Sequence, residues 1–125
     1  MFISMVRSKI HLARVTEAVL NYVGSIGIDS DLLKQAGMYP YEKVLVANVE
    51  TGARLETYII PKPAGSRIIS LNGAAARLAS VGDRVIIMTF ALVEPPPPPD
   101  YEPRVLILNA ANEVESVLGP PVKEG

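Results

Sequence analysis

The dipeptide Gly24-Ser25 offers the most distinctive chemistry in this chain. A serine hydroxyl can attack the carbonyl carbon of the preceding residue, and glycine leaves that carbonyl unhindered and tolerates strained backbone angles. An acyl shift then gives an ester, elimination leaves dehydroalanine, and hydrolysis yields a pyruvoyl group with release of ammonia. The alternative is a turn serine that caps nearby backbone groups, and the dipeptide alone favours that alternative.

A pyruvoyl group formed from Ser25 would give the chain a built-in electron sink. Its ketone forms a Schiff base with an amine, and the conjugated system accepts the electrons left when CO₂ departs. This chemistry needs no bound coenzyme and no metal. A single histidine and the absence of cysteine also argue against a metal site within one chain.

Lys9 and His11 are candidates for binding an anionic substrate. Apolar Ile10 and Leu12 alternate with them, and this period of two predicts a strand on which Lys9 and His11 share one face. Lys9 is a compact charge that suits a carboxylate, and His11 can orient a substrate or donate a hydrogen bond. For Lys9 alone, a solvated strand face is the better interpretation.

Arg54 and Tyr58 share one face of a second predicted strand, Arg54 to Ile60. An arginine binds a carboxylate through two parallel hydrogen bonds. The alternative for Arg54 is a surface salt bridge with Glu56 or Asp83, which contributes little to stability. A tyrosine, with a pKa of about 10, stays protonated at neutral pH and can protonate a carbanion. The alternative for Tyr58 is a half-buried packing role.

Thr57 points to the opposite face of that strand, so Thr57 and Tyr58 reach one site only through a bulge, strand twist or approach from the side. Further along, a turn leads into a short helix and offers free backbone N–H groups to a carboxylate or carbonyl oxygen. Its small side chains allow a ligand to approach closely. This turn consists of Asn72, Gly73, Ala74 and Ala75.

These residues must be positioned by short strands and two short helical segments. Asp29 is a predicted N-cap of a helix that ends at Gly37, and Ala74 to Ala79 predicts one or two further helical turns. Period-two patterns and short apolar runs predict strands around residues 9–13, 18–22, 44–46, 54–60, 67–71, 83–92 and 104–108. This composition of elements favours a mainly β fold closed into a barrel.

The C-terminal quarter of the chain carries less information. Pro95 to Pro99 predicts an extended polyproline strap on the surface, which cannot join a sheet ladder. Residues 94–125 would thus comprise this strap, a last strand and a tail, Gly119 to Gly125, that we expect to be poorly ordered.

The bulk composition indicates one domain, residues 1–125, with a core that needs no disulfide or metal. The formal charge of −1 gives no reason to expect a nucleic-acid partner. No stretch predicts a membrane span, and the first residues show no export signal. We therefore expect a soluble, cytoplasmic protein.

The order and spacing of these motifs resemble the aspartate 1-decarboxylase family across about residues 1–93. The resemblance rests on Lys9 and His11, on Tyr22-Val23-Gly24-Ser25, on residues 54–58 and on residues 67–76. It implies a six-stranded double-psi β-barrel with short helices and a proenzyme that cleaves itself into residues 1–24 and 25–125. It further implies the conversion of L-aspartate to β-alanine and CO₂, for pantothenate and coenzyme A synthesis.

The resemblance also implies individual roles. Tyr58 would be the proton donor, Thr57 would assist cleavage and substrate binding, and Tyr22 would support the residues that touch the substrate. The turn that starts at Asn72 would hold the substrate, with the asparagine side chain at the cleavage site. The family implies a homotetramer with active sites between subunits, so Lys9 and Tyr58 need not belong to the same chain.

Two alternatives remain at this point. One is a non-enzymatic β-barrel module that binds an anionic partner through its basic face, with Gly24-Ser25 as an ordinary turn. The other is a pyruvoyl decarboxylase of another amino acid, although Arg54 and Lys9 together favour a substrate with two carboxylates.

Overall fold

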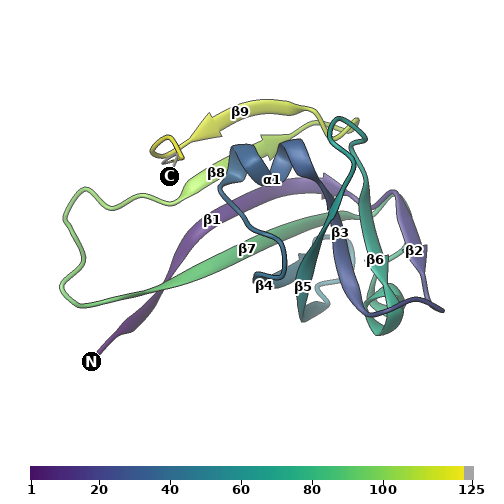
Figure 1. Cartoon of the computed structure of the whole chain (residues 1–125), viewed down its shortest axis with the longest axis horizontal. Coiled ribbons are helices and arrows are strands. Elements are labelled where there is room, and N and C mark those ends of the chain that lie inside the picture. Colours follow the sequence, from purple (N-terminus) through teal and green to yellow (C-terminus); the bar gives the residue numbers. More distant parts are fainter. Residues whose placement is uncertain (123–125) are drawn as a thin grey trace.

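The computed structural model describes residues 1–122 and is built mainly from β-strands, which confirms the predicted class (Figure 1). Two short helical elements interrupt them, the α-helix α1 (Ser30–Ala36) and the 3₁₀-helix η1 (Gly73–Leu78). The strands are β1 (Ile3–Arg14), β2 (Glu17–Val19), β3 (Ser25–Asp29), β4 (Lys43–Asn48), β5 (Arg54–Lys62), β6 (Ile69–Asn72), β7 (Arg84–Val93), β8 (Arg104–Leu108) and β9 (Val114–Leu118).

Within residues 1–122 these nine strands form one continuous hydrogen-bonded order, β2-β6-β3-β5-β4-β7-β1-β8-β9. Three neighbouring pairs are parallel, namely β1 with β8, β2 with β6 and β3 with β5. The strand count exceeds the six that the family resemblance implies, and the closed double-psi topology stays a prediction. Strand β9 had no predicted counterpart, because most of its side chains are exposed and show no apolar alternation.

Several boundaries differ from the sequence-based expectations. The predicted strand to Tyr22 was wrong beyond Val19, since β2 ends there and the chain bends and stays exposed up to Gly24. Strand β6 begins at Ile69 rather than Arg67, because Arg67 has a left-handed φ of 58° that a strand cannot accommodate. Because β2 ends at Val19, residues 20–24 form an exposed surface segment, not a strand, before β3 begins.

The C-terminal part lies against the sheet. No helix or strand spans residues 94–103, where Tyr101 donates a hydrogen bond from its hydroxyl to the Val6 carbonyl at 2.6 Å. The Arg104 guanidinium donates to the Pro120 carbonyl at 3.2 Å. The expectation of a poorly ordered tail also covers residues 123–125, which lie outside the described residues.

The core is made of aliphatic side chains that alternate along the central strands. Full burial of each contributes about 1.5–3 kcal/mol relative to exposure. Helix α1 adds Leu32, Leu33 and Ala36, with Asp29 as its N-cap and Gly37 at φ 72° as its C-cap, as the sequence predicts. The largest fully buried side chains are Ile10, Ile26, Ile28, Ile59, Ile69, Leu71, Ile87 and Leu106.

Asp29 anchors the C-terminal end of β3. Its carboxylate is buried and accepts three backbone N–H groups, from Asp31 at 2.8 Å, Gly65 at 3.0 Å and Arg67 at 2.7 Å. Each bond satisfies an otherwise costly buried charge. The same side chain thus starts α1 and holds the 63–68 loop, which leads into β6, against the end of β3.

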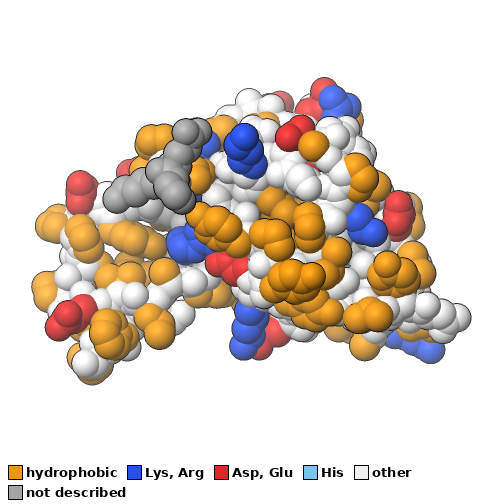
Figure 2. All heavy atoms as spheres, in the orientation of Figure 1, with side chains coloured by type: hydrophobic (Ala, Val, Ile, Leu, Met, Phe, Trp, Pro, Cys, Tyr) orange, Lys and Arg blue, Asp and Glu red, His pale blue; other side chains and the backbone are white. Residues whose placement is uncertain are grey.

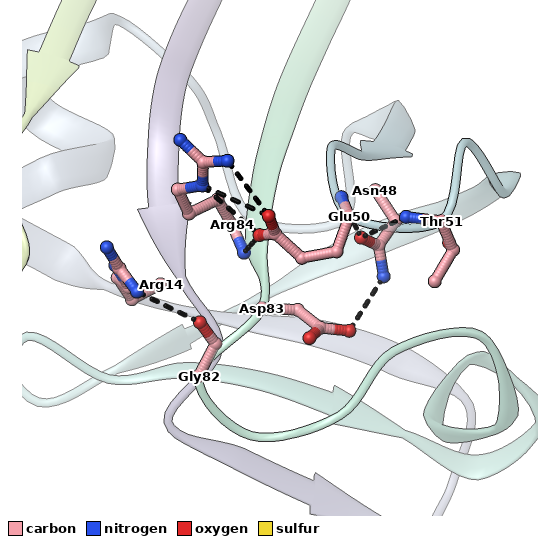
Figure 3. A network of polar contacts seen from close by, with 7 residues as sticks. All are labelled: Arg14, Asn48, Glu50, Thr51, Gly82, Asp83 and Arg84. Atoms are coloured by element: carbon pink, nitrogen blue, oxygen red, sulfur yellow. Dashed lines mark hydrogen bonds and ion pairs between the residues drawn. The ribbon is translucent and has the colours of Figure 1, made fainter.

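A polar network ties the β4–β5 turn to the start of β7 (Figure 3). The Asn48 side chain accepts from the backbone N–H groups of Glu50 and Thr51 and donates to Asp83 at 2.9 Å. The Glu50 carboxylate pairs with the Arg84 guanidinium at 2.9 Å. Asn48 also donates to the Leu78 carbonyl at 3.1 Å, so the network connects the hairpin that carries β5 to the end of η1.

We predict a pH-dependent contribution of Glu50 to stability. Hydrogen bonds from Arg84 lower the pKa of Glu50 from 4.5 to about 2. A lowered pKa in the folded state gives stability that is complete above pH 4.5 and is lost as the pH falls toward 2. Thermal unfolding of wild type and Glu50→Gln should therefore show a small Tm difference above pH 4.5 that shrinks below it.

The effect should be small because the pair is partly exposed, and added salt should reduce it further. A matched control is Glu115→Gln, which removes a carboxylate outside this network. A Tm difference for Glu50→Gln that stays constant across this pH range would contradict the assignment.

Candidate active site

Ser25 lies at the boundary between an exposed segment and a buried strand. Residues 16–24 are all exposed, whereas every residue of β3, from Ser25 to Asp29, is buried. Only 1% of Ser25 is accessible to solvent. The Gly24-Ser25 bond thus joins accessible chain to a strand that β5 and β6 hold on both sides.

Two polar side chains and one backbone carbonyl fix the orientation of the Ser25 hydroxyl. Ser25 is the register partner of Asn72 on β6, and the Asn72 amide Nδ2 donates to Ser25 Oγ at 3.1 Å. The Ser70 hydroxyl donates to Asn72 Oδ1 at 2.8 Å and thereby holds the amide. Ser25 Oγ in turn donates to the Val23 carbonyl at 3.4 Å. Because Ser70 and Asn72 are buried, water competes little for these bonds.

Gly73 brings the start of η1 against the Gly24 backbone. Its φ is 64°, and a Cβ at this position would lie 2.7 Å from the Gly24 Cα and 2.8 Å from the Tyr22 carbonyl oxygen. Any other residue would have to displace backbone at the Gly24-Ser25 bond. Strand β6 ends at Asn72 and η1 begins directly at Gly73, so no separate turn stands between them, and Gly73 touches the chain on the N-terminal side of Ser25.

A cavity of about 340 Å³ opens beside Gly24. Strand β5 supplies one wall and η1 supplies the other. The cavity brings together five of the residues that the sequence singled out, together with three that it did not. Its lining residues are Gly24, Leu55, Glu56, Thr57, Tyr58, Ala74, Ala75 and Leu78.

Thr57 and Tyr58 both line this cavity although they are neighbours on one strand. No bulge interrupts the pairing of β5 with β4, which covers Arg54 to Tyr58. The pairing of β5 with β3 begins only at Ile59, so the β3-facing edge of β5 carries no strand partner at Thr57 and Tyr58. The cavity lies against this unpaired stretch, which explains how both residues can line it.

Tyr41 is a neighbour of Tyr58 that the sequence reasoning missed. The two rings stack with centroids 6.3 Å apart and an interplanar angle of 22°, a favourable aromatic geometry. Tyr41 has a φ of 67°, and its backbone N–H donates to the Ile59 carbonyl at 2.7 Å. The Tyr41 ring therefore limits the rotation of the Tyr58 ring, whose backbone is already held by the pairing of β5 with β4.

Lys9 and His11 do not line this cavity. Both lie on β1, and β4 and β7 separate β1 from β5 in the sheet order. The His11 Nδ1 atom is buried without a hydrogen-bond partner among the described residues. Burial first, and the positive charge of Lys9 second, lower the pKa of His11 below 6.5. His11 thus favours its neutral form at neutral pH.

Arg54 and Tyr22 are also outside the cavity lining. Arg54 is exposed at the first position of β5, and none of the ion pairs among residues 1–122 involves it. The alternative salt bridge with Glu56 is wrong, because Glu56 pairs with Lys43 at 2.8 Å. Tyr22 is 59% exposed in the segment that precedes the Gly24-Ser25 bond.

The fold and the site define a mainly β protein with a buried serine held behind an exposed glycine, next to a small cavity. The chain belongs to the aspartate decarboxylase family, whose sequence profile matches residues 1–115. This confirms the predicted family and an enzyme of this kind, and it extends the match beyond residue 93 into the C-terminal quarter of the chain.

Curated relatives support the same assignment. The chain is similar to the aspartate 1-decarboxylase of Coprothermobacter proteolyticus, with 56% identity over 94% of this chain and 96% of the relative. It is 54% identical to that of Carboxydothermus hydrogenoformans, over 94% of this chain and 92% of the relative. The Bacillus subtilis enzyme of this name is 52% identical, over 95% of this chain and 94% of the relative.

Residues 1–122 contain no group of three or more His, Cys, Asp or Glu side chains arranged to hold a metal ion. None of the helices in this part of the chain is long and apolar enough to cross a membrane.

We predict that the pKa of His11, the sole histidine, can be measured directly and is lowered by its surroundings. Proton NMR should show His11 titrating below 6.5, because burial and Lys9 both disfavour the charged imidazolium. Lys9→Met should raise this pKa but leave it below 6.5, since burial is the larger cause. Lys9→Arg, which keeps the charge, is the control. An unchanged pKa in Lys9→Met would exclude an electrostatic contact between the two side chains.

Proposed function

We propose that the chain is a pyruvoyl-dependent decarboxylase that converts L-aspartate to β-alanine and CO₂ after cleaving itself between Gly24 and Ser25. The observation that carries this proposal is the Asn72–Ser25 hydrogen bond, which orients a buried hydroxyl directly after an exposed glycine. Cleavage would turn the single domain into two associated fragments, residues 1–24 and 25–125.

The chain separates only in the second step of self-cleavage, when elimination removes the Ser25 α-proton and expels the Gly24 carboxylate; hydrolysis of the resulting dehydroalanine then gives the pyruvoyl group and ammonia. In the first step, the acyl shift, Ser25 Oγ forms a bond to the Gly24 carbonyl carbon and the Gly24-Ser25 peptide bond breaks. The hydroxyl proton ends on the released Ser25 amine, and an ester still joins the two residues. The intermediate carries an oxyanion that needs a donor. Thr57 is suited to this role because it lines the same cavity as Gly24 and carries a hydroxyl.

The residues around Ser25 fit a pyruvoyl group at this position. Asn72 offers an N–H donor beside the Ser25 side chain, and Ala74 and Ala75 keep the adjoining cavity wall small. The pyruvoyl group supplies a ketone that takes up the substrate amine and accepts the electrons released with CO₂. No metal is required for this role.

The substrate's carboxylates need cationic partners, and the carbanion needs a proton. Arg54 suits a carboxylate, with Lys9 and His11 as further partners. Tyr58 is the proton donor, because it lines the cavity next to Gly24 and its phenolic hydroxyl can give a proton to the carbanion. Gly73, Ala74 and Ala75 present backbone close to the substrate, and Tyr22 supports the site from outside the cavity.

Two strands, β4 and β7, lie between β1 and the strand β5 that lines the cavity. This separation supports active sites built between subunits of a homotetramer. Lys9 and His11 would then serve the cavity of a neighbouring subunit. An apolar projecting arm also suits subunit contact. It is formed by the start of β1 and the end of β7, and orange side chains cover it in Figure 2. Its exposed members are Met1, Phe2, Phe90 and Leu92.

The product β-alanine would feed pantothenate and coenzyme A synthesis in the cytoplasm. A chain without cysteine is compatible with that compartment. Its net charge of −1 gives no electrostatic attraction to a nucleic acid. Membership of a decarboxylase family decides against the non-enzymatic binding module. The two cations Arg54 and Lys9 favour a substrate with two carboxylates, such as L-aspartate, over an amino acid with a single carboxylate.

Cleavage is the first test. Freshly purified wild type should separate under denaturing conditions into residues 1–24 and 25–125, with a carbonyl-reactive group on the larger fragment. Ser25→Ala lacks the nucleophile and should remain one chain. Intact-mass measurement distinguishes the two outcomes, and cleavage of Ser25→Ala at the same bond would overturn the serine-driven route.

Tyr58→Phe separates proton donation from packing. It keeps the ring and its stack on Tyr41 but removes the hydroxyl. Cleavage should continue, because the hydroxyl does not attack Gly24. Release of β-alanine from L-aspartate should fall by about two to four orders of magnitude, as expected for loss of a positioned acid. Tyr41→Phe, which keeps the stack and loses only the neighbouring hydroxyl, is the matched control.

A Tyr58→Phe variant that turns over at the wild-type rate with its carbonyl-reactive group intact would limit Tyr58 to packing. Tyr22 and His11 would then be the next candidates for the acid.

A further inference from the structure

Lys62 lies across the strand that begins with Ser25. It is the last residue of β5 and the register partner of Asp29 on β3. A Cβ at Gly27 would lie 2.5 Å from the Lys62 Cε, 3.0 Å from its Cγ and 3.3 Å from its Cδ. The aliphatic stem of Lys62 therefore occupies the space that a side chain at position 27 would need.

Hydrogen bonds and strand pairing hold the backbone of Lys62 in place. The Ser30 hydroxyl, at the start of α1, donates to the Lys62 carbonyl at 2.6 Å. The parallel pairing of β3 with β5 also ends at this residue. The base of the side chain is thus fixed, and only its end is free to reach a partner.

The ammonium of Lys62 reaches the surface segment before the Gly24-Ser25 bond. Its Nζ lies 5.9 Å from the centre of the Tyr22 ring, within the range of a cation–π contact. None of the ion pairs among residues 1–122 involves Lys62. Lys62 thus connects the exposed residue Tyr22 to buried β3, on either side of the bond between Gly24 and Ser25.

We propose that Lys62 is a positioning residue for self-cleavage, an inference that rests on the proposed cleavage at Gly24-Ser25. Attack requires the Gly24 carbonyl carbon to stay about 3–3.5 Å from Ser25 Oγ in a defined orientation. The segment that carries Gly24 is exposed and lacks strand pairing after Val19. The Lys62–Tyr22 contact restricts this segment and increases the time that the carbonyl spends in the reactive position.

The test measures how fast the freshly made full-length precursor disappears, by intact mass at fixed temperature. Lys62→Met keeps most of the apolar stem over Gly27 but removes the charge. Its cleavage should be about two- to fivefold slower, which corresponds to the roughly 0.5–1 kcal/mol of an exposed cation–π contact. Lys62→Arg keeps a cation that stacks on aromatic rings and should cleave at close to the wild-type rate.

A double-mutant cycle tests whether Lys62 acts through Tyr22. Tyr22→Leu should slow cleavage to the same extent as Lys62→Met, and the double variant should be no slower than either one. Tyr22→Phe keeps the ring face and should retain the wild-type rate. Each variant is also made with Ser25→Ala, so that the Tm of the uncleaved precursor shows whether folding has changed.

Four outcomes would overturn the positioning role. They are a wild-type rate in Lys62→Met, equal slowing in Lys62→Met and Lys62→Arg, additive slowing in the double variant, and slowing matched by a lower precursor Tm. In each of these cases the proposed function stands as long as wild type cleaves. A wild-type chain that never cleaves would overturn both proposals.

Discussion

The arrangement of this site depends on the anchoring of β3 at both of its ends. The Asp29 carboxylate accepts three backbone N–H groups at one end, and Asn72 holds the Ser25 hydroxyl at the other. Between them the strand is fully buried, with β5 and β6 on either side. Because neither end of β3 can move without losing buried polar bonds, the serine keeps a fixed position while the chain before it stays accessible.

The cavity depends on a gap in strand pairing rather than on a loop. Strand β5 pairs with β4 up to Tyr58 and with β3 from Ile59 onward, which leaves one edge unpaired beside Gly24. The 3₁₀-helix η1 forms the facing wall, and the Asn48 network links its end to the β4–β5 hairpin. A rigid frame therefore surrounds a small space, as an active site that positions a substrate requires.

Two glycines near the Gly24-Ser25 bond allow other parts of the chain to approach closely. Gly73 has no room for a Cβ because the Gly24 backbone lies against it. At Gly27 the Lys62 stem fills the corresponding space, so a larger residue there would have to push this flexible side chain aside. The first approach presses the start of η1 onto the glycine of this bond, and the second carries a cation to Tyr22. Both glycines thus shape the segment in which we propose that cleavage occurs.

The sequence by itself determined the local features, namely the capped α1 helix between Asp29 and Gly37, the mainly β class and the motif set that marks the family. These follow from side-chain type and short-range periodicity. Only the tertiary structure decided that Thr57 and Tyr58 line one cavity, that Lys9 lies outside it, and that Lys62 meets Tyr22. Such contacts depend on which distant strands pair and where that pairing stops, and no local pattern encodes this register.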